Sequence, residues 1–234
     1  MKLISINSQI KLFIISLSIL TSLNSCKSIQ NANNAQKGGV LGAAGGAVLG
    51  AIIGNNVGGS GELGAVIGGV VGGGAGVLIG NKMDKQAQKI EEEIPGAVVE
   101  RIDDSIVITF DENSGVYFDT NKYDINTKSQ TSLNKLAEVF MEYPDTNISV
   151  TGHTDNAGPD DYNMTLSKNR AYAVTNYLQA KGLNSNRFST NWSGELEPIS
   201  DNNTTEGRAQ NRRVNVAIVP NEKMISDAKT ISGE

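Results

Sequence analysis

The pattern of hydrophobic and polar positions along residues 97–220 predicts a mixture of strands and helices. Two short apolar runs lie on either side of the acidic pair Asp103 and Asp104, which indicates two strands joined by a turn. Three later segments are also typical of strands, and they cover residues 147–152, 187–194 and 214–219.

Two segments between these strands follow the period of an α-helix instead. In the first, Leu133, Leu136 and Phe140 fall on one helical face, and Pro144 ends the pattern. The second is predicted to run from about residue 161 to residue 181, where Gly182 follows. Strands that alternate with helices predict an α/β fold in which the helices pack against one sheet.

A different pattern precedes this region, because glycine recurs at every fourth residue over 38–54 and again over 64–80. Glycine costs about 1 kcal/mol per residue in a helix in water, whereas glycines on one stripe let helices pack closely in an apolar medium. We therefore predict a glycine-zipper helical hairpin over residues 38–80. Each ladder of 17 residues corresponds to about 25 Å of helix, short of a bilayer core of about 30 Å. Two arrangements of the hairpin therefore stay open. It inserts into the membrane, or it packs on itself or on neighbours at the membrane surface.

The segments that flank the globular region are polar. Residues 81–96 are rich in charge and predict a solvated helical connector. Residues 221–234 form a polar tail, which we expect to be loosely ordered.

The first 25 residues indicate an export signal, because lysines precede an apolar segment over 12–23 that is short for a membrane span. Cys26 is the only cysteine, and it follows this segment in the sequence LNSC. This arrangement is typical of a bacterial lipobox, whose cysteine is lipidated with acyl chains such as palmitate and becomes the new N-terminus. Residues 26–37 are then a polar linker. An ordinary signal peptide with an incidental cysteine is the alternative.

Composition narrows the function further. The net charge is −5 and no basic stripe is present, which excludes nucleic acid as the expected partner.

The stretch TGHTDNAG contains the only histidine, His153, followed by Asp155. One histidine and one cysteine cannot build a His/Cys metal cluster, and no Ser-His-acid set is visible. We expect neither a cofactor nor catalysis, and we interpret His153 as a loop-shaping or satisfied core residue. A periplasmic hydrolase that uses His153 and Asp155 is the less favoured alternative.

Arg170 conflicts with the apolar stripe of the second helix. It lies four residues after Leu166 and four before Val174, and burying an unpaired guanidinium is costly. It must therefore be paired, or lie where the stripe opens into a cleft. Asp155 is the natural partner, because its loop immediately precedes the helix. A purely structural Arg–Asp pair is the alternative.

Several motifs together resemble the OmpA-like peptidoglycan-binding domain. Their order and spacing carry the resemblance, which covers about residues 105–219. The motifs are VYFDTNKYDI at 116–125, GHTDNAG at 152–158, NMTLSKNRAYAV at 163–174, GELEP at 194–198 and EGRAQNRRV at 206–214. Together with the lipobox and the glycine ladders, the chain resembles YiaD-type outer-membrane lipoproteins.

The resemblance implies an OmpA-like βαβαββ sandwich over residues 97–220, whose loops hold the diaminopimelate-containing peptide of peptidoglycan. It implies that the family's key aspartate is Asp155 and its key arginine Arg170. A carboxylate can capture the ligand's ammonium group, and a guanidinium fork can engage its carboxylate. The other positions that match the family's pocket are Phe118, Asp119, Asn121, Thr154, Asn163 and Arg212. Because Arg213 is adjacent, which arginine faces the site stays open.

The resulting hypothesis is a non-catalytic outer-membrane lipoprotein that anchors the membrane to the cell wall. Its partners are peptidoglycan and the membrane. It contacts the membrane through the lipid on Cys26 and, in one alternative, also through the hairpin. The wall-binding domain faces the periplasm. A membrane-oligomerising, pore-like or stator-like homo-oligomer that uses this domain as its anchor is the alternative function.

Overall fold

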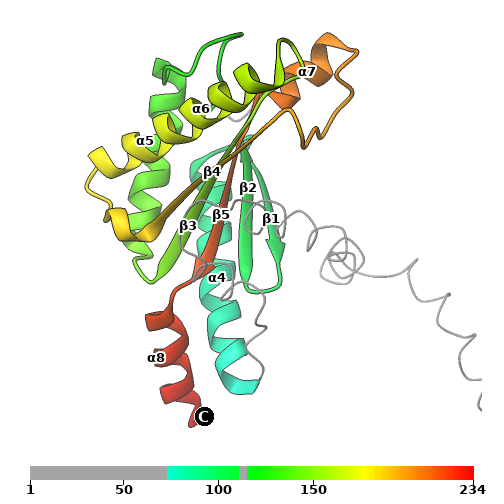
Figure 1. Ribbon diagram of the computed structural model, residues 1–234. Coiled ribbons are helices and arrows are strands. Elements are labelled where there is room, and N and C mark those ends of the chain that lie inside the picture. The colour runs from blue at the N-terminus through cyan, green and yellow to red at the C-terminus, as the bar shows by residue number, and fades with distance from the viewer. Residues whose placement is uncertain (1–72, 111–114) are drawn as a thin grey trace, which may run out of the picture. The chain divides into compact units, whose positions relative to one another are not determined.

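The computed structural model describes residues 73–110 and 115–234 (Figure 1). The predictions for the signal peptide 1–25, lipidation of Cys26 and the polar linker 26–37 lie outside these residues. So does the predicted hairpin up to residue 72.

A five-stranded sheet forms the centre of the described region, with strand order β1-β2-β5-β3-β4. Its strands are β1 (Val98–Ile102), β2 (Ser105–Phe110), β3 (Thr146–His153), β4 (Phe188–Gly194) and β5 (Val214–Pro220). The pair β3–β4 is parallel, and the other three neighbouring pairs are antiparallel. All five predicted strands are present, with ends that differ by one or two residues.

Helices α5 (Thr127–Glu142) and α6 (Asp160–Ala180) connect these strands. The side chain of Asn126 accepts a hydrogen bond from the backbone N–H of Ser129 at 2.8 Å, which caps the start of α5. The order β2-α5-β3-α6-β4-β5 is the expected βαβαββ arrangement, and β1 adds a strand at the edge. The predicted α/β fold is therefore confirmed.

Helix α4 (Gly73–Glu93) crosses the predicted boundary between the hairpin and the charged connector. Ile79, Met83 and Ile90 on one of its faces have no exposed surface and join the core formed by α5, α6 and the sheet. A fully solvated connector is therefore wrong, because apolar residues recur at three- and four-residue intervals within the charged sequence. No described atom lies within 4 Å of a Cβ built at Gly80, so this glycine marks no close helix contact in the described region.

Residues 222–232 form helix α8 (Glu222–Ser232), so the expectation of a loosely ordered tail is wrong. The side chain of Asn221 caps its start, and Met224 and Ala228 are buried. At its far end, the Glu234 carboxylate accepts a hydrogen bond from the backbone N–H of Gly74 at 2.8 Å. Because the end of α8 thereby meets the start of α4, the two helices lie antiparallel side by side (Figure 1).

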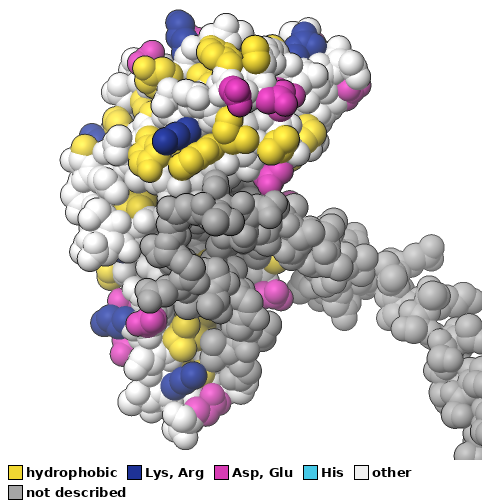
Figure 2. All heavy atoms as spheres, viewed as in Figure 1, with side chains coloured by type: hydrophobic (Ala, Val, Ile, Leu, Met, Phe, Trp, Pro, Cys, Tyr) yellow, Lys and Arg dark blue, Asp and Glu magenta, His cyan; other side chains and the backbone are white. Residues whose placement is uncertain are grey.

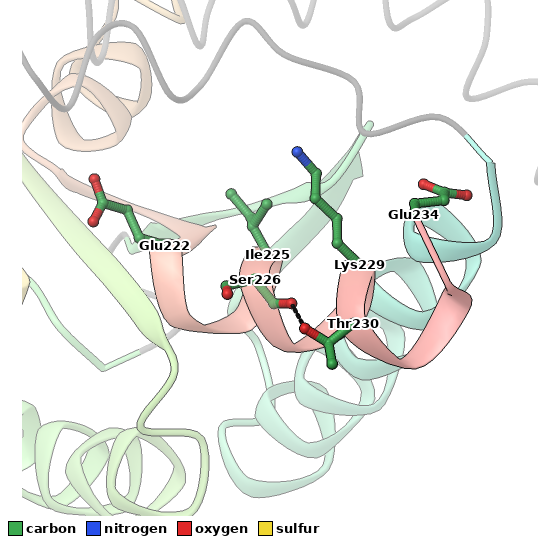
Figure 3. A pocket seen from close by; sticks show the side chains of 6 residues that line it. All are labelled: Glu222, Ile225, Ser226, Lys229, Thr230 and Glu234. Carbon is green, nitrogen blue, oxygen red and sulfur yellow. Dashed lines mark hydrogen bonds between the residues drawn. The ribbon is translucent and has the colours of Figure 1, made fainter.

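An open pocket lies along α8. Figure 3 shows its side chains, among which the Thr230 hydroxyl donates a hydrogen bond to the Ser226 carbonyl. The residues that line it are Glu222, Ile225, Ser226, Lys229, Thr230 and Glu234. In the part of the chain that the structure describes, no helix is both long and apolar enough to cross a membrane.

Two short helices between β4 and its neighbours in sequence were not predicted, namely η2 (Ser185–Arg187) and α7 (Thr205–Asn211). The hydroxyl of Thr204 caps α7 by accepting from the N–H of Gly207 at 2.9 Å. Asn211 at its end is fully buried, and its side-chain oxygen accepts from the N–H groups of Ile199 and Ser200. These bonds fix the backbone that leads into β5, and with it the position of Arg212.

Candidate functional site

Most of the predicted site residues gather at the end of the sheet where β3 finishes and α6 begins. Gly152 brings helix and strand together, because a Cβ at this position would collide with the carbonyl oxygen of Ser167. The Ser167 hydroxyl in turn accepts a hydrogen bond from the backbone N–H of Gly194 at 2.9 Å. Helix α6 is thereby fixed to both β3 and β4, which sets where its first turns stand.

Arg170 is the largest fully buried side chain, and backbone carbonyl groups surround its guanidinium. Its Nε donates to the carbonyl of Lys122 at 3.0 Å, Nη1 to that of His153 at 3.1 Å, and Nη2 to that of Asp119 at 3.2 Å. The ring of Phe118 lies 5.2 Å from the guanidinium carbon, a distance that suits a cation–π contact. Arg170 therefore ties the loop before α5 to the end of β3.

The charge of Arg170 is balanced at a distance rather than by a direct partner. Burial lowers the pKa of Arg170 to about 10, the nearby Asp155 carboxylate raises it, and Arg212 lowers it. The group stays protonated at neutral pH. The predicted direct pairing with Asp155 is wrong, since carbonyls of the loop before α5 and of the end of β3 take its place. Arg170 has no exposed surface. A ligand that reaches the protein in this conformation therefore contacts Asp155 and Arg212 first.

Asp155 and Arg212 form an ion pair at the mouth of the site. Nη1 of Arg212 lies 2.9 Å from Oδ2 of Asp155, and the side chains are 20% and 9% exposed, respectively. The other carboxylate oxygen accepts from the N–H of Ala157 at 3.2 Å, which orients the loop. Arg213 points elsewhere and donates to the carbonyl of Glu197 at 2.9 Å. Of the two adjacent arginines, Arg212 is thus the one that faces Asp155.

Three buried polar atoms close to this pair have no hydrogen-bond partner in the described region. They are Oγ1 of Thr154, Oδ1 of Asn163 and Nε of Arg212. Each such atom costs roughly 1–3 kcal/mol when it is left unpaired, so a cluster of them indicates that a ligand or water supplies the missing bonds. The amide nitrogen of Asn163 donates to the carboxylate of Glu195.

Glu195 is a site residue that sequence reasoning missed. Its position lies in the GELEP motif, which we used for the resemblance without assigning a role to any of its side chains. The N–H of Thr154 donates to the carbonyl of Gly194 at 2.8 Å, which holds the strand end that carries Glu195 beside the Asp155 loop.

Asp119 and Asn121 are placed differently from the expectation that their side chains line the pocket. Both side chains are exposed, and the Asp119 carboxylate contacts Nζ of Lys122 at 3.1 Å. Asn121 has a φ of 60°, in the left-handed region that asparagine tolerates better than most residues. This turn lets the carbonyls of Asp119 and Lys122 both reach Arg170, so the loop contributes through its backbone.

His153 is buried, with 1% of its surface exposed. Neither ring nitrogen has a hydrogen-bond partner among the described residues, and Nδ1 lies 3.9 Å from a carboxylate oxygen of Glu197. Burial, and secondly the charge of Arg213, hold the pKa of His153 well below 6.5, so the ring is neutral. His153 is a core residue as expected, but its ring is not satisfied, and its carbonyl is what shapes the site. The described residues contain no group of three or more His, Cys, Asp or Glu that could hold a metal.

Comparison with known proteins finds two families that match different parts of the chain. Residues 117–212 match the OmpA family, and residues 8–84 match the YMGG-like Gly-zipper. The chain is 36% identical over 144 residues to Probable lipoprotein YiaD of Escherichia coli, covering 61% of this chain and 65% of that protein. It is 39% identical over 111 residues to Outer membrane protein A of Bordetella avium, covering 47% and 57%.

A third relative is Peptidoglycan-binding protein ArfA of Mycobacterium bovis, 40% identical over 86 residues, which are 37% of this chain and 26% of that protein. The chain thus spans less than two thirds of the length of each of these relatives. Among solved structures, the cell wall anchor of the T6SS from Pseudomonas aeruginosa aligns with a TM-score of 0.51 and 26% identity, over 59% of this chain and 96% of that one. Residues 117–212 thus match the OmpA family, in agreement with the resemblance that the sequence motifs indicated.

Proposed function

We propose that this chain is a non-catalytic wall anchor that binds the diaminopimelate-containing peptide of peptidoglycan at the end of the sheet that carries Asp155 and Arg212. The observation that carries the proposal is this largely buried ion pair, surrounded by buried polar atoms that lack hydrogen-bond partners among the described residues. The printed names of the relatives, a peptidoglycan-binding protein and a cell wall anchor, support the same class of ligand.

The chemistry of diaminopimelate matches the ion pair. The end of its side chain carries an ammonium and a carboxylate group on one carbon, so it offers both charges at once. The ammonium binds Asp155, and the carboxylate binds the Nε side of Arg212, which has no hydrogen-bond partner among the described residues. Binding exchanges one internal ion pair for two external ones, so no buried charge is left uncompensated. The free atoms of Thr154 and Asn163 then take hydrogen bonds from the ligand.

Arg170 acts in this proposal as a positioning residue. Its three bonds to carbonyls hold the loop before α5 against the end of β3, and its charge keeps the floor of the site positive. Only three of its five N–H groups bond to carbonyls of the described residues. A small opening of the mouth would let the other two engage the ligand carboxylate.

The membrane side of the anchor is also proposed. Lipidation at Cys26 fixes the chain to the outer membrane, and the domain extends from it into the periplasm. The similarity to a probable lipoprotein and to an outer membrane protein supports this placement. The relatives named above are structural or binding proteins, which supports a role without catalysis.

The test is sedimentation of the full chain with isolated peptidoglycan of the diaminopimelate type. Asp155→Asn removes the carboxylate at nearly constant shape and should lower affinity at least 30-fold, since breaking a buried charge pair costs about 2–5 kcal/mol. Asp145→Asn is the matched control, because Asp145 pairs with the exposed Lys223 at the other end of the sheet. A folded Asp155→Asn variant that sediments like the parent would contradict the proposal, and release of muropeptides would favour a hydrolase.

A further inference from the structure

Glu195 lies beside the site and has no part in the function proposed so far. Its carboxylate accepts a hydrogen bond from the amide nitrogen of Asn163, a side chain that is 1% exposed. The end of β4 lies against the start of α6 at this point, because a Cβ built on Gly194 would stand 3.3 Å from the backbone nitrogen of Met164. The close approach of this strand and this helix therefore makes Glu195 and Asn163 neighbours.

The bond to Glu195 decides which way the amide group of Asn163 is turned. A carboxylate carries no proton and can only accept, so the amide atom that faces it must be the nitrogen Nδ2. The oxygen Oδ1 then lies on the other arm of the planar amide, 4.0 Å from the position that a Cβ would take on Gly158. Because Gly158 belongs to the loop that carries Asp155, Glu195 holds Oδ1 toward that loop.

Oδ1 of Asn163 is an acceptor that still needs a donor. It is buried and has no hydrogen-bond partner among the described residues. The Asp155 carboxylate borders the same short loop, since one of its oxygens accepts from the backbone N–H of Ala157. Two acceptors along one turn match a cationic group with several N–H donors, which an ammonium offers and a carboxylate does not.

We infer that Glu195 is a positioning residue that makes the site selective for an ammonium group, an inference that rests on the proposed function. The ammonium of the ligand donates to Asp155 and to Oδ1 of Asn163 at once. Glu195 does not touch the ligand, and it acts by keeping the Asn163 amide from turning over. A turned amide presents Nδ2 to the ammonium, and two donors that face each other repel.

Charge alone offers a competing explanation for any effect of Glu195. Asp160 and Asp161 lie in the first turn of α6, and Figure 2 shows acidic side chains on the surface at the end of the domain where α6 and α7 lie. Such groups attract an ammonium without orienting an acceptor toward it. A substitution that removes the charge of Glu195 and keeps an acceptor oxygen separates the two explanations.

Calorimetry of the full chain with two soluble tripeptides tests the inference. Both begin with L-alanine and D-glutamate. One ends in diaminopimelate, and the other ends in 2-aminopimelate, which keeps the carboxylate at the end of the side chain and lacks the ammonium beside it. Glu195→Ala should weaken binding of the diaminopimelate peptide about tenfold, the loss expected for one hydrogen bond to a charged group. Binding of the aminopimelate peptide should not change.

Two further variants identify how Glu195 acts. Glu195→Gln is the matched control, because glutamine can turn its own amide so that its oxygen accepts from Asn163. It should bind the diaminopimelate peptide within about threefold of the parent, although its charge is lost. In an Asn163→Ala background, Glu195→Ala should cause no further loss, because two residues that act through one contact are not additive.

The outcomes separate the two proposals. Parent-like binding by Glu195→Ala overturns the positioning role and leaves the peptide site intact. An equal loss in Glu195→Gln assigns the effect to charge, a further loss in the Asn163→Ala background assigns it to another contact, and either result also overturns the positioning role. A parent chain that binds neither peptide, or both equally, overturns the proposed function together with the inference. Thermal melts of every variant monitor the fold.

Discussion

One arginine lies at each end of the sheet, Arg170 buried and Arg187 half-buried, and each donates to backbone carbonyls from distant segments. At the end opposite the site, Arg187 donates Nε to the carbonyl of Thr146 at 2.8 Å, Nη1 to that of Phe140 at 2.7 Å and Nη2 to that of Tyr143 at 2.9 Å. At the site end, Arg170 likewise donates to three carbonyls. By their own hydrogen bonds the two residues look alike.

The surroundings of the two arginines differ. Arg187 meets carbonyls at the C-terminal end of α5, the end where a helix favours positive charge. Around Arg170 lie a second arginine, Arg212, the carboxylate of Asp155, and polar atoms that have no partner in the part of the chain that the structure describes. Hydrogen bonds from an arginine to backbone carbonyls are therefore, on their own, only a sign of a structural role. The unsatisfied groups and the concentration of charge beside it distinguish a candidate binding site.

The largest expected effect is the loss of cooperative folding when helix α4 is removed. Chains that begin at residue 73 and at residue 97 differ by α4, which buries Ile79, Met83 and Ile90 completely. Each such side chain stabilises the fold by about 1.5–3 kcal/mol, and their sum approaches a typical net stability of about 5–15 kcal/mol. In thermal melts followed by circular dichroism, the longer chain should unfold cooperatively and the shorter one should show no cooperative transition. Equal melting temperatures would show that α4 is dispensable.

Lysine substitutions at Arg187 and Arg170 should have effects of intermediate size, and their effects on peptidoglycan sedimentation should differ. Arg187→Lys should lower the free energy of unfolding by about 2 kcal/mol or more, because one ammonium cannot replace several charged hydrogen bonds, and peptidoglycan sedimentation should persist. Arg170→Lys should lower both the free energy of unfolding and sedimentation. Urea denaturation and sedimentation of the same preparations supply the measurements. If both variants lost sedimentation to the same degree, the distinction between a structural and a functional arginine would fail.

The smallest effect is the dependence of stability on pH through His153. The folded state holds the pKa of His153 well below 6.5, so only the unfolded chain takes up the proton as the pH falls through this range. The contribution of neutral His153 to the free energy of unfolding should therefore be fully present above about pH 6.5. Below that pH it should decline by at most about 1.4 kcal/mol per pH unit. His153→Gln should show a shallower decline between pH 7 and pH 5 in urea titrations. Equal slopes for parent and variant would mean that the ring titrates normally in the folded protein.

Local periodicity predicted the sheet and its two main helices, because each strand and helix carries its own apolar pattern. Helix α8 escaped prediction, since its buried face rests on little more than Met224 and Ala228. The partner of Arg170 could not be derived from local pattern, because Asp119 and Lys122 are 51 and 48 residues away in sequence and contribute carbonyls. Backbone groups have no residue-specific signal, whereas the motifs did indicate Asp155 and Arg212.

The most direct test of the central claim is calorimetric titration of the full chain with two tripeptides that differ in one group. One ends in diaminopimelate and the other in lysine, which keeps the ammonium and lacks the carboxylate beside it. If Asp155 and Arg212 together bind a zwitterion, the diaminopimelate peptide should bind at least tenfold more tightly, equivalent to about 1.4 kcal/mol, and Arg212→Gln should abolish the difference. Equal affinity of the parent chain for both peptides would contradict the account.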